Sequence, residues 1–245
     1  RQEARFSAYH CLRLCGMGLP MGLQCSITAI GSVVLQSAVN GLGSAIVAAQ
    51  TAGGRAGMIL SVPLESLGTT MTTFTGQNKG ACRLDRVRAG VNDCLIVSAL
   101  YSAAAFGILH FADKLLICLF VDGSETEIIA NAQKMLFWNS MFYVLLGTLI
   151  IYRYTLQGLG CSMLAMFAGV AEMAARGAVG FWFVGRVGYL AACIASPIAW
   201  MFACVFLVPA YFVTIRRQQR ELGAVQKAAA APQAAGAEFA KISKE

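Results

Sequence analysis

The chain has little charge for its length. Of its 245 residues, 13% are charged and 58% are hydrophobic, and the mean hydropathy is +0.64. A soluble domain carries about 25% charged residues. A chain with half that density cannot cover a globule of this size with polar side chains. The composition therefore excludes an ordinary soluble domain and indicates an integral membrane protein.

Residues that do chemistry or bind metals are also scarce. The two histidines, His10 and His110, are far apart, and the nine cysteines form no CxxC pair. Most of these cysteines lie in apolar runs, where they are typical of small hydrophobic residues rather than of disulfides or metal ligands. Residues 76–81 lack the Lys-Ser/Thr ending of a phosphate-binding loop. We therefore expect no enzyme, no metal site and no cofactor.

Six runs are long and apolar enough to cross a membrane, which takes about 20 residues. They cover residues 18–42, 45–74, 91–111, 131–156, 163–187 and 188–215. Only helices or closed barrels satisfy the backbone in lipid, and these runs are too long and uniformly apolar for barrel strands. The sequence predicts an all-α bundle of six transmembrane helices over residues 15–215. A segment over residues 1–14 and a basic, Ala-rich, weakly structured tail over residues 216–245 flank it.

The formal charge of +7 would suggest nucleic acid in a soluble protein, but here it orients the chain. Most Lys and Arg residues, Arg153 and those of the 77–90 loop among them, fall on one side of the predicted spans. Lys114, Lys134 and Arg186 fall on the other, and Arg55 and Arg176 fall within spans. This asymmetry predicts that both termini and the 77–90 loop are cytoplasmic and that residues 113–133 face outside. We expect a multi-pass protein of a bacterial-type plasma membrane, with no nucleic-acid partner.

Polar residues recur where a membrane makes them costly. In the first run they occur every fourth residue, which places them on one ridge of a helix, and two more open the fourth run: Gln24, Thr28, Ser32, Gln36 and Asn40, then Asn139 and Tyr143. Such residues face protein or water rather than lipid. They form either the wall of a solvated substrate cavity or a set of hydrogen bonds between helices.

Charged residues within the runs are the other candidates for function. Glu65 follows Pro63, which we expect to bend the helix, and it is either a proton or cation site or the partner of an arginine. Glu172 and Arg176 stand four residues apart, so they can pair on one helix. That pair either ties helices together or takes part in coupling. Arg55 is a further charge in the second run.

Several motifs together resemble one transporter family. They are residues 18–24, residues 40–44 with Ala48 and Ala49, Arg55, Pro63, the element Gly76-Gln77-Asn78-Lys79-Gly80-Ala81, the element Leu156-Gln157-Gly158-Leu159-Gly160, and residues 169–176. The pattern is similar to the C-terminal half of a multidrug and toxic compound extrusion (MATE) transporter, within the multidrug/oligosaccharidyl-lipid/polysaccharide flippase superfamily. Gln77, Asn78, Gly80, Gln157 and Gly158 are the motif residues, the first three in a loop.

The resemblance implies twelve helices in two six-helix lobes, of which this chain is the C-terminal lobe. A cleft between the lobes would bind small organic cations, and inward Na⁺ or H⁺ would drive their export by alternating access. The sequence shows no internal repeat of six helices, so we expect an N-terminal lobe of the same polypeptide as the missing partner. Acidic residues that some members carry are replaced here, near Thr28 and at Leu145-Leu146. The coupling acid is then in the other lobe, or it is Glu65 or Glu172.

Two alternatives remain open at this point. A flippase for lipids or lipid-linked oligosaccharides of the same superfamily would share the fold. A six-helix membrane scaffold, or a half-transporter that forms a dimer, would not need a second lobe. No motif of this chain specifies the substrate, the coupling ion or the direction in which the cleft opens.

Overall fold

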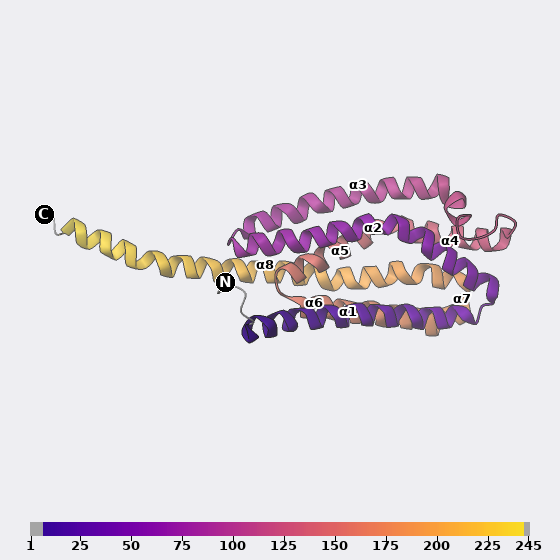
Figure 1. The fold of residues 1–245 in the computed structure, drawn as a ribbon, viewed down its shortest axis with the longest axis horizontal. Coiled ribbons are helices and arrows are strands. Elements are labelled where there is room, and N and C mark those ends of the chain that lie inside the picture. Colours follow the sequence, from indigo (N-terminus) through magenta and orange to yellow (C-terminus); the bar gives the residue numbers. More distant parts are fainter. Residues whose placement is uncertain (1–6, 243–245) are drawn as a thin grey trace.

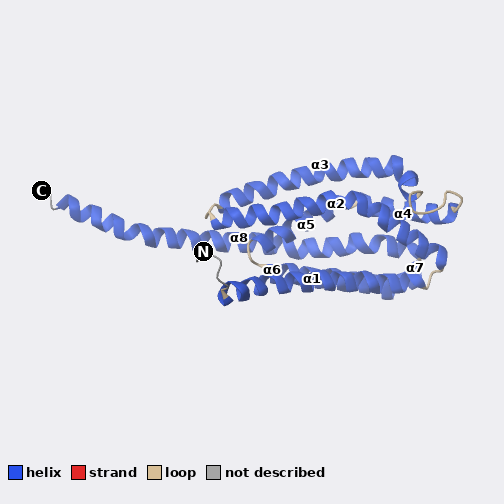
Figure 2. Cartoon of the chain, in the orientation of Figure 1, coloured by secondary structure: helices blue, strands red, loops and turns tan. Residues whose placement is uncertain are grey.

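The computed structural model describes residues 7–242, with side chains described as far as residue 224. The described residues form helices joined by short turns and contain no strand (Figure 2). The elements are α1 (Ala8–Asn40), α2 (Ser44–Gly80), α3 (Leu84–Ile117), α4 (Thr126–Met141), α5 (Tyr143–Gly158), α6 (Ser162–Ala178), the π-helical turn η1 (Val179–Phe183), α7 (Val184–Val187) and α8 (Tyr189–Ile242).

The long helices lie side by side in an elongated bundle (Figure 1). α1 packs chiefly against α6, while α2 packs against α3, α4 and α5, and α8 contacts both groups. The turn between α1 and α2 is tight because Gly43 has a φ of 107°, a conformation that suits a residue without a Cβ atom. α2 changes direction along its length, and its N-terminal part slants toward α1. Pro63 lies within α2 and removes one of its backbone hydrogen bonds.

Four helical segments are long and apolar enough to cross a membrane, and the α4–α5 pair qualifies as a fifth. The four are Ala8–Asn40, Leu84–Ile117, Ser162–Val187 and Tyr189–Ala224. α2, which contains the predicted span 45–74, is not among them, because Arg55, Glu65 and many Ser, Thr and Gly residues interrupt its apolar run. The hydropathy of this helix alone therefore does not support a span.

The predicted fourth span is not one continuous helix, as the run 131–156 had indicated. It divides at Phe142 into α4 and α5, which meet at an angle of 54°. Phe142 has a ψ of 15°, and its N–H bonds the carbonyl of Asn139 at 3.1 Å. Neither Gly nor Pro marks this break in the sequence, so local patterning did not reveal it. The break places Asn139 and Tyr143 on either side of a bend.

The connections are shorter than hydropathy predicted. The expected 77–90 loop is reduced to residues 81–83, because α2 continues to Gly80 and α3 begins at Leu84. Gln77, Asn78 and Gly80 therefore form the last turn of a helix and not a loop. The expected 113–133 loop is reduced to residues 118–125. Hydropathy detects only the segment that lipid covers, whereas a helix continues beyond it.

The expectation of a weakly structured tail is wrong for residues 216–242, which continue α8 as a helix that projects beyond the bundle (Figure 1). Ala, Arg, Gln, Glu and Lys have high helix propensity, and a polar composition argues against a packed core rather than against a helix. Residues 8–14 are likewise helical, because α1 begins at Ala8. Residues 1–6 and 243–245 lie outside the described part.

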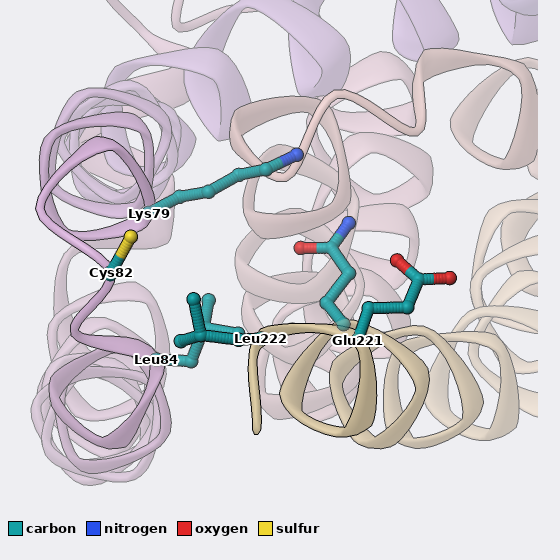
Figure 3. Close-up of a pocket in the computed structure, with 6 residues that line it drawn as sticks. Lys79, Cys82, Leu84, Glu221 and Leu222 are labelled. Atoms are coloured by element: carbon teal, nitrogen blue, oxygen red, sulfur yellow. The ribbon is translucent and has the colours of Figure 1, made fainter. Parts of the chain in front are cut away.

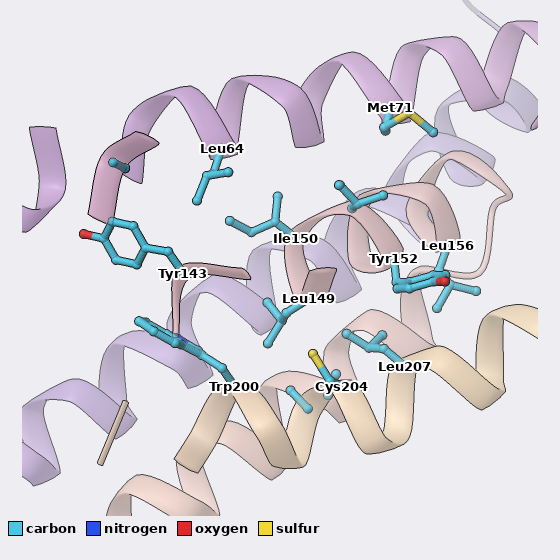
Figure 4. Close-up of a cluster of buried hydrophobic side chains, with 14 of the residues drawn as sticks. Leu64, Met71, Tyr143, Leu149, Ile150, Tyr152, Leu156, Trp200, Cys204 and Leu207 are labelled. Carbon is cyan, nitrogen blue, oxygen red and sulfur yellow. The ribbon is translucent and has the colours of Figure 1, made fainter. Parts of the chain in front are cut away.

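The main apolar core lies between α2, α3, α4, α5 and α8. Leu64, Leu149, Ile150, Leu156 and Leu207 are fully buried there, as Figure 4 shows. A second, smaller core joins α1, η1, α7 and α8 through Leu35, Val39, Val179 and Val184. Lipid is as apolar as these side chains, so close packing rather than escape from water holds them together.

Candidate functional site

A cluster of three charges is buried where α5 and α6 meet. Glu172 is 2% exposed, and Arg153 and Arg176 are 8% and 7% exposed. Arg153 donates a hydrogen bond through Nη2 to Glu172 Oε1, and Nη2 of Arg176 lies 3.6 Å from Glu172 Oε2. The pairing between Glu172 and Arg176 that their spacing predicted is present. The cluster holds two guanidinium groups and one carboxylate, so it carries one surplus positive charge.

The sequence grouped Arg153 with the cytoplasmic basic residues and did not predict the burial of its side chain, which the structure shows. Its side chain points into the bundle, where it is the second partner of Glu172. A hint lay in the surrounding run, since Arg153 is flanked by apolar and aromatic residues that are themselves buried. Its Nε has no hydrogen-bond partner among the described residues.

The polar ridge of α1 divides into parts with different roles. Gln24 is buried and accepts a hydrogen bond from Gln157 Nε2 of α5 at 3.2 Å, which matches the alternative of hydrogen bonds between helices. Thr28 donates to the carbonyl of Gln24 at 2.9 Å, and its own carbonyl accepts from Arg176 at 3.5 Å. Gln36 donates to Asn40 at 3.2 Å, further along the same helix. Ser32 faces a cavity.

That cavity has a volume of about 510 Å³, within the range of small-molecule sites. Helices α1, α2, α4, α5, α6 and α8 all contribute to its lining. Five predicted residues line it together: Ser32, Glu65, Asn139, Tyr143 and Arg176. Gln24, Thr28, Gln36 and Asn40, which the sequence grouped with them, are not part of the lining. The remaining lining residues are Gly53, Gly54, Gly57, Met58, Ser61, Met135, Leu136, Leu146, Ser196 and Trp200.

Glu65 is the carboxylate of this cavity, and its position is fixed from α5. Tyr154 donates a hydrogen bond from its hydroxyl to Glu65 Oε2 at 2.9 Å. The Glu65 side chain is exposed, and among the described residues no Lys or Arg lies within ion-pair distance of it. Of the two alternatives for Glu65, an ion pair with an arginine is therefore not seen among the described residues. Arg55, also on α2, is exposed and does not line the cavity.

Tyrosine hydroxyls fix α2 near its proline. Tyr143 donates to the carbonyl of Gly57 at 3.1 Å, and Tyr101 of α3 donates to the carbonyl of Leu60 at 2.8 Å. A proline within a helix removes one backbone hydrogen bond, and side chains of neighbouring helices can add hydrogen bonds to backbone carbonyls in membrane proteins. These bonds hold the cavity wall in a defined shape. They were not visible in the sequence, because each joins residues far apart along the chain.

A larger cavity, of about 680 Å³, lies between α6, η1, α7 and α8. Its lining consists of Ala, Val and Ile residues together with Trp182, Phe183 and Phe202. It offers no charged group to orient a ligand, so the smaller, polar cavity is the better candidate site. Among the described residues, no three His, Cys, Asp or Glu side chains gather as a metal site would require.

The two motif elements meet at the end of the bundle where α2 joins α3. Lys79 Nζ donates to the carbonyl of Leu159, which also accepts from Gln218 Nε2 of α8 at 3.2 Å. Asn78 donates to the carbonyl of Phe74 at 2.8 Å. A small pocket of about 300 Å³ lies beside this junction, with Lys79, Cys82, Leu84, Glu221 and Leu222 on its wall (Figure 3). Burial raises the pKa of the nearby Cys161 thiol, which therefore stays protonated at neutral pH.

Gly158 brings α5 against α2 at this junction. A Cβ atom there would lie 2.7 Å from the carbonyl oxygen of Thr72 and 2.8 Å from Cβ of Thr75. Gly80, the other motif glycine, has no neighbouring atom within 4 Å of such a Cβ. Gln157 is buried and donates a hydrogen bond to Gln24 of α1, while Gln77 is exposed. Of the five motif residues, Gly158 and Gln157 thus contact neighbouring helices, and none of the five lines the cavity.

Long apolar helices around a cavity with polar and charged lining residues define the class as a multi-pass helical membrane protein. The family model MatE matches residues 20–182. The chain belongs to the MatE family.

Known relatives agree with this assignment. A Bacillus subtilis (strain 168) protein described as "Probable multidrug resistance protein YpnP" is 28% identical over 147 residues, which are 60% of this chain and 33% of that protein. The crystal structure of a MATE protein in the bent conformation superposes with a TM-score of 0.80 at 17% identity, covering 91% of this chain and 49% of that one. The chain thus spans a third of the curated relative and about half of the solved structure.

The same fold occurs in two conformations of a MATE transporter. The TM-score is 0.74 to an outward-facing structure, at 18% identity over 84% of this chain and 45% of that chain. It is 0.68 to an inward-facing structure, at 17% identity over 91% of this chain and 50% of that chain. Likeness at this identity shows the fold alone.

Proposed function

We propose that this chain is the C-terminal lobe of a secondary active efflux transporter that exports cationic drugs or metabolites in exchange for Na⁺ or H⁺. Family membership, and the name of the Bacillus subtilis relative as a probable multidrug resistance protein, support a transport function. Coverage of about half of the solved transporter chains supports a partner lobe. The chain works in a bilayer, we propose that of a bacterial-type plasma membrane, with both termini in the cytoplasm.

The observation that carries this proposal is the carboxylate of Glu65 on the wall of a cavity of about 510 Å³. The Glu65 side chain is exposed at this wall, and a carboxylate attracts a nearby cation by its negative charge. The aromatic rings of Tyr143 and Trp200, whose centroids are 6.5 Å apart, line the same space and can bind a cation through their faces. The cavity therefore suits a small organic cation with an apolar body.

Exchange follows if the substrate and the coupling ion compete for one carboxylate. Glu65 suits that role better than Glu172, because Glu172 is already engaged by two arginines. The side chain of Glu65 is exposed and has only a tyrosine hydroxyl as its described partner. Binding of H⁺ or Na⁺ to Glu65 would lower the affinity of the cavity for a cation, and alternating access would convert this competition into export.

The test is dye efflux by the protein expressed from its whole reading frame in vesicles. We expect a gradient of Na⁺ or H⁺ to drive efflux of a cationic dye, and Glu65→Gln to reduce the ion-dependent rate by about tenfold or more, since a charge-assisted contact is lost. Glu221→Gln, which alters an exposed carboxylate on α8, is the matched control. If no cationic dye is exported in an ion-dependent manner, the proposal is wrong.

The same cavity argues against a lipid-linked oligosaccharide flippase. Recognition of a pyrophosphate calls for several free cationic groups, and among the described lining residues Arg176 is the single cation. The scaffold and half-transporter alternatives differ from our proposal in what precedes Arg1. An upstream reading frame that encodes six more hydrophobic spans would agree with a two-lobe transporter, whereas a start codon directly upstream would favour a dimer of half-size chains.

A further inference from the structure

The buried charge cluster and the cavity share one residue, Arg176. Its guanidinium belongs to the cluster with Glu172 and Arg153, and its side chain also lines the cavity. Its two described contacts are long, at 3.6 Å to Glu172 Oε2 and 3.5 Å to the carbonyl of Thr28. Glu172 is bonded more closely by Arg153. Arg176 is therefore the less firmly held of the two arginines, and it is the one that reaches the ligand space.

The net charge of the cluster depends on what balances Arg176. Two arginines around one glutamate leave a net positive charge, and an unbalanced charge is unfavourable within a bilayer. Among the described lining residues, Glu65 is the only other charged group of the cavity. While Glu65 is ionised and free, it balances the surplus. When the cationic group of a ligand neutralises Glu65, the charge of Arg176 is again unbalanced.

We infer that Arg176 recognises an anionic group of the substrate, so that the preferred ligands of the cavity are zwitterions carrying a carboxylate or a similar anion beside their cationic group. This inference rests on the proposed function, in which Glu65 receives the cation. A zwitterion can neutralise the carboxylate of Glu65 with its cationic group and the guanidinium of Arg176 with its anionic group. A simple cation can neutralise only the carboxylate. Ser32 and Ser196 line the cavity as well, and hydroxyls of this kind can donate to a bound anion.

One substitution at Arg176 removes its charge without leaving another buried charge unpaired. Replacing Arg176 by glutamine removes the surplus charge and leaves Arg153 and Glu172 as a balanced pair, so Arg176→Gln is expected to fold. The Thr28 carbonyl, its other described partner, can still accept a hydrogen bond from the glutamine amide. Arg176→Lys keeps the charge but not the two-pronged guanidinium. Arg55→Gln is the matched control, because Arg55 is an exposed arginine of the bundle that does not line the cavity.

The test measures binding of two dyes to the purified protein in nanodiscs by fluorescence polarisation. Rhodamine 110 carries a free carboxylate, and rhodamine 123 is its methyl ester, so the pair differ in one anionic group. We expect the unaltered protein to bind rhodamine 110 more tightly. Arg176→Gln should raise the dissociation constant of rhodamine 110 by about tenfold. It should change the dissociation constant of rhodamine 123 by less than about twofold. Arg176→Lys should restore part of the preference, and Arg55→Gln should retain all of it.

The outcomes separate this inference from the proposed function. If rhodamine 123 binds as tightly as rhodamine 110, and Arg176→Gln affects both alike, Arg176 does not read an anion, although a cation site at Glu65 can stand. Equal loss of both dyes in Arg176→Gln, with an unchanged thermal unfolding midpoint, would likewise refute the inference. If neither dye binds the unaltered protein and ion-driven efflux is absent too, the proposed function itself fails.

Discussion

At the scale of single residues, Glu172 is the acid on which the buried cluster depends. It is shared by Arg153 from α5 and Arg176 from its own helix. Loss of one arginine leaves a matched pair, whereas loss of the glutamate leaves two buried guanidinium groups without a counter-charge. The three members are therefore not equivalent, although their burial is similar.

We predict that Glu172→Gln destabilises the protein by about 3–5 kcal/mol, the usual effect of leaving a buried charge uncompensated, and far more than Arg176→Gln does. Thermal unfolding in detergent, followed by loss of helical circular dichroism, measures the difference. Glu221→Gln is the control, since it breaks an exposed pair with Arg217 and should leave the unfolding midpoint unchanged. Equal midpoints for Glu172→Gln and Arg176→Gln would contradict the charge count given above.

At the scale of helices, the close approach of α5 to α2 depends on glycines that the sequence treats alike. Gly158 and Gly80 both belong to the motif elements, yet only Gly158 faces a neighbouring backbone. Close packing of this kind stabilises helix pairs in lipid, because lipid tails are as apolar as the side chains and the hydrophobic effect does not drive the helices together. The sequence identified the motif, and the structure assigns its packing role to one of the two glycines.

Gly158→Ala is expected to destabilise the bundle by about 1–3 kcal/mol, because the added methyl group would overlap the Thr72 carbonyl and force the helices apart. Gly80→Ala, with open space around its Cβ, should be neutral or slightly stabilising through higher helix propensity. Thermal unfolding of the two variants side by side checks this. The packing account fails if Gly80→Ala is the more destabilising of the two.

The polar ridge of α1 shows what residue spacing can and cannot predict about a helix. Spacing of four residues correctly grouped Gln24, Thr28 and Ser32 on one side of a helix. It did not show that Gln24 would bond Gln157 while Ser32 would line the cavity, because that depends on which helices lie opposite. For the same reason, Asn139 and Tyr143 could be named as cavity residues, while the bend between them could not be foreseen.

At the scale of the whole molecule, the orientation of the chain in the membrane follows from its charge asymmetry and can be measured directly. Two native cysteines serve as reporters, because Cys82 and Cys118 are exposed and lie at or beside opposite ends of α3. The excess of Lys and Arg places Cys82 in the cytoplasm and Cys118 outside.

We expect a membrane-impermeant maleimide added to intact cells to label Cys118 and to leave Cys82 unlabelled until the cells are permeabilised. Each cysteine is tested in a background where the other exposed cysteines, at positions 11, 15 and 25 and the remaining reporter, are replaced by serine. Mass spectrometry of the labelled protein gives the readout. The reverse pattern would show that the chain is inserted with its termini outside.

The sequence by itself determined that this is an all-α membrane protein of the MatE family, because composition, run length and short motifs are local properties of the chain. It also named Glu65, Glu172, Arg176 and Arg55 as candidate charges for coupling or structure, and their functional role stays a prediction. The spacing of Glu172 and Arg176 also predicted that they pair, whereas only the tertiary structure showed the partners that come from other helices. Arg153 meets Glu172 across 19 positions, Tyr154 meets Glu65 across 89 and Gln157 meets Gln24 across 133. Which helices face one another is set by packing across the whole bundle, and no window along the chain contains that information.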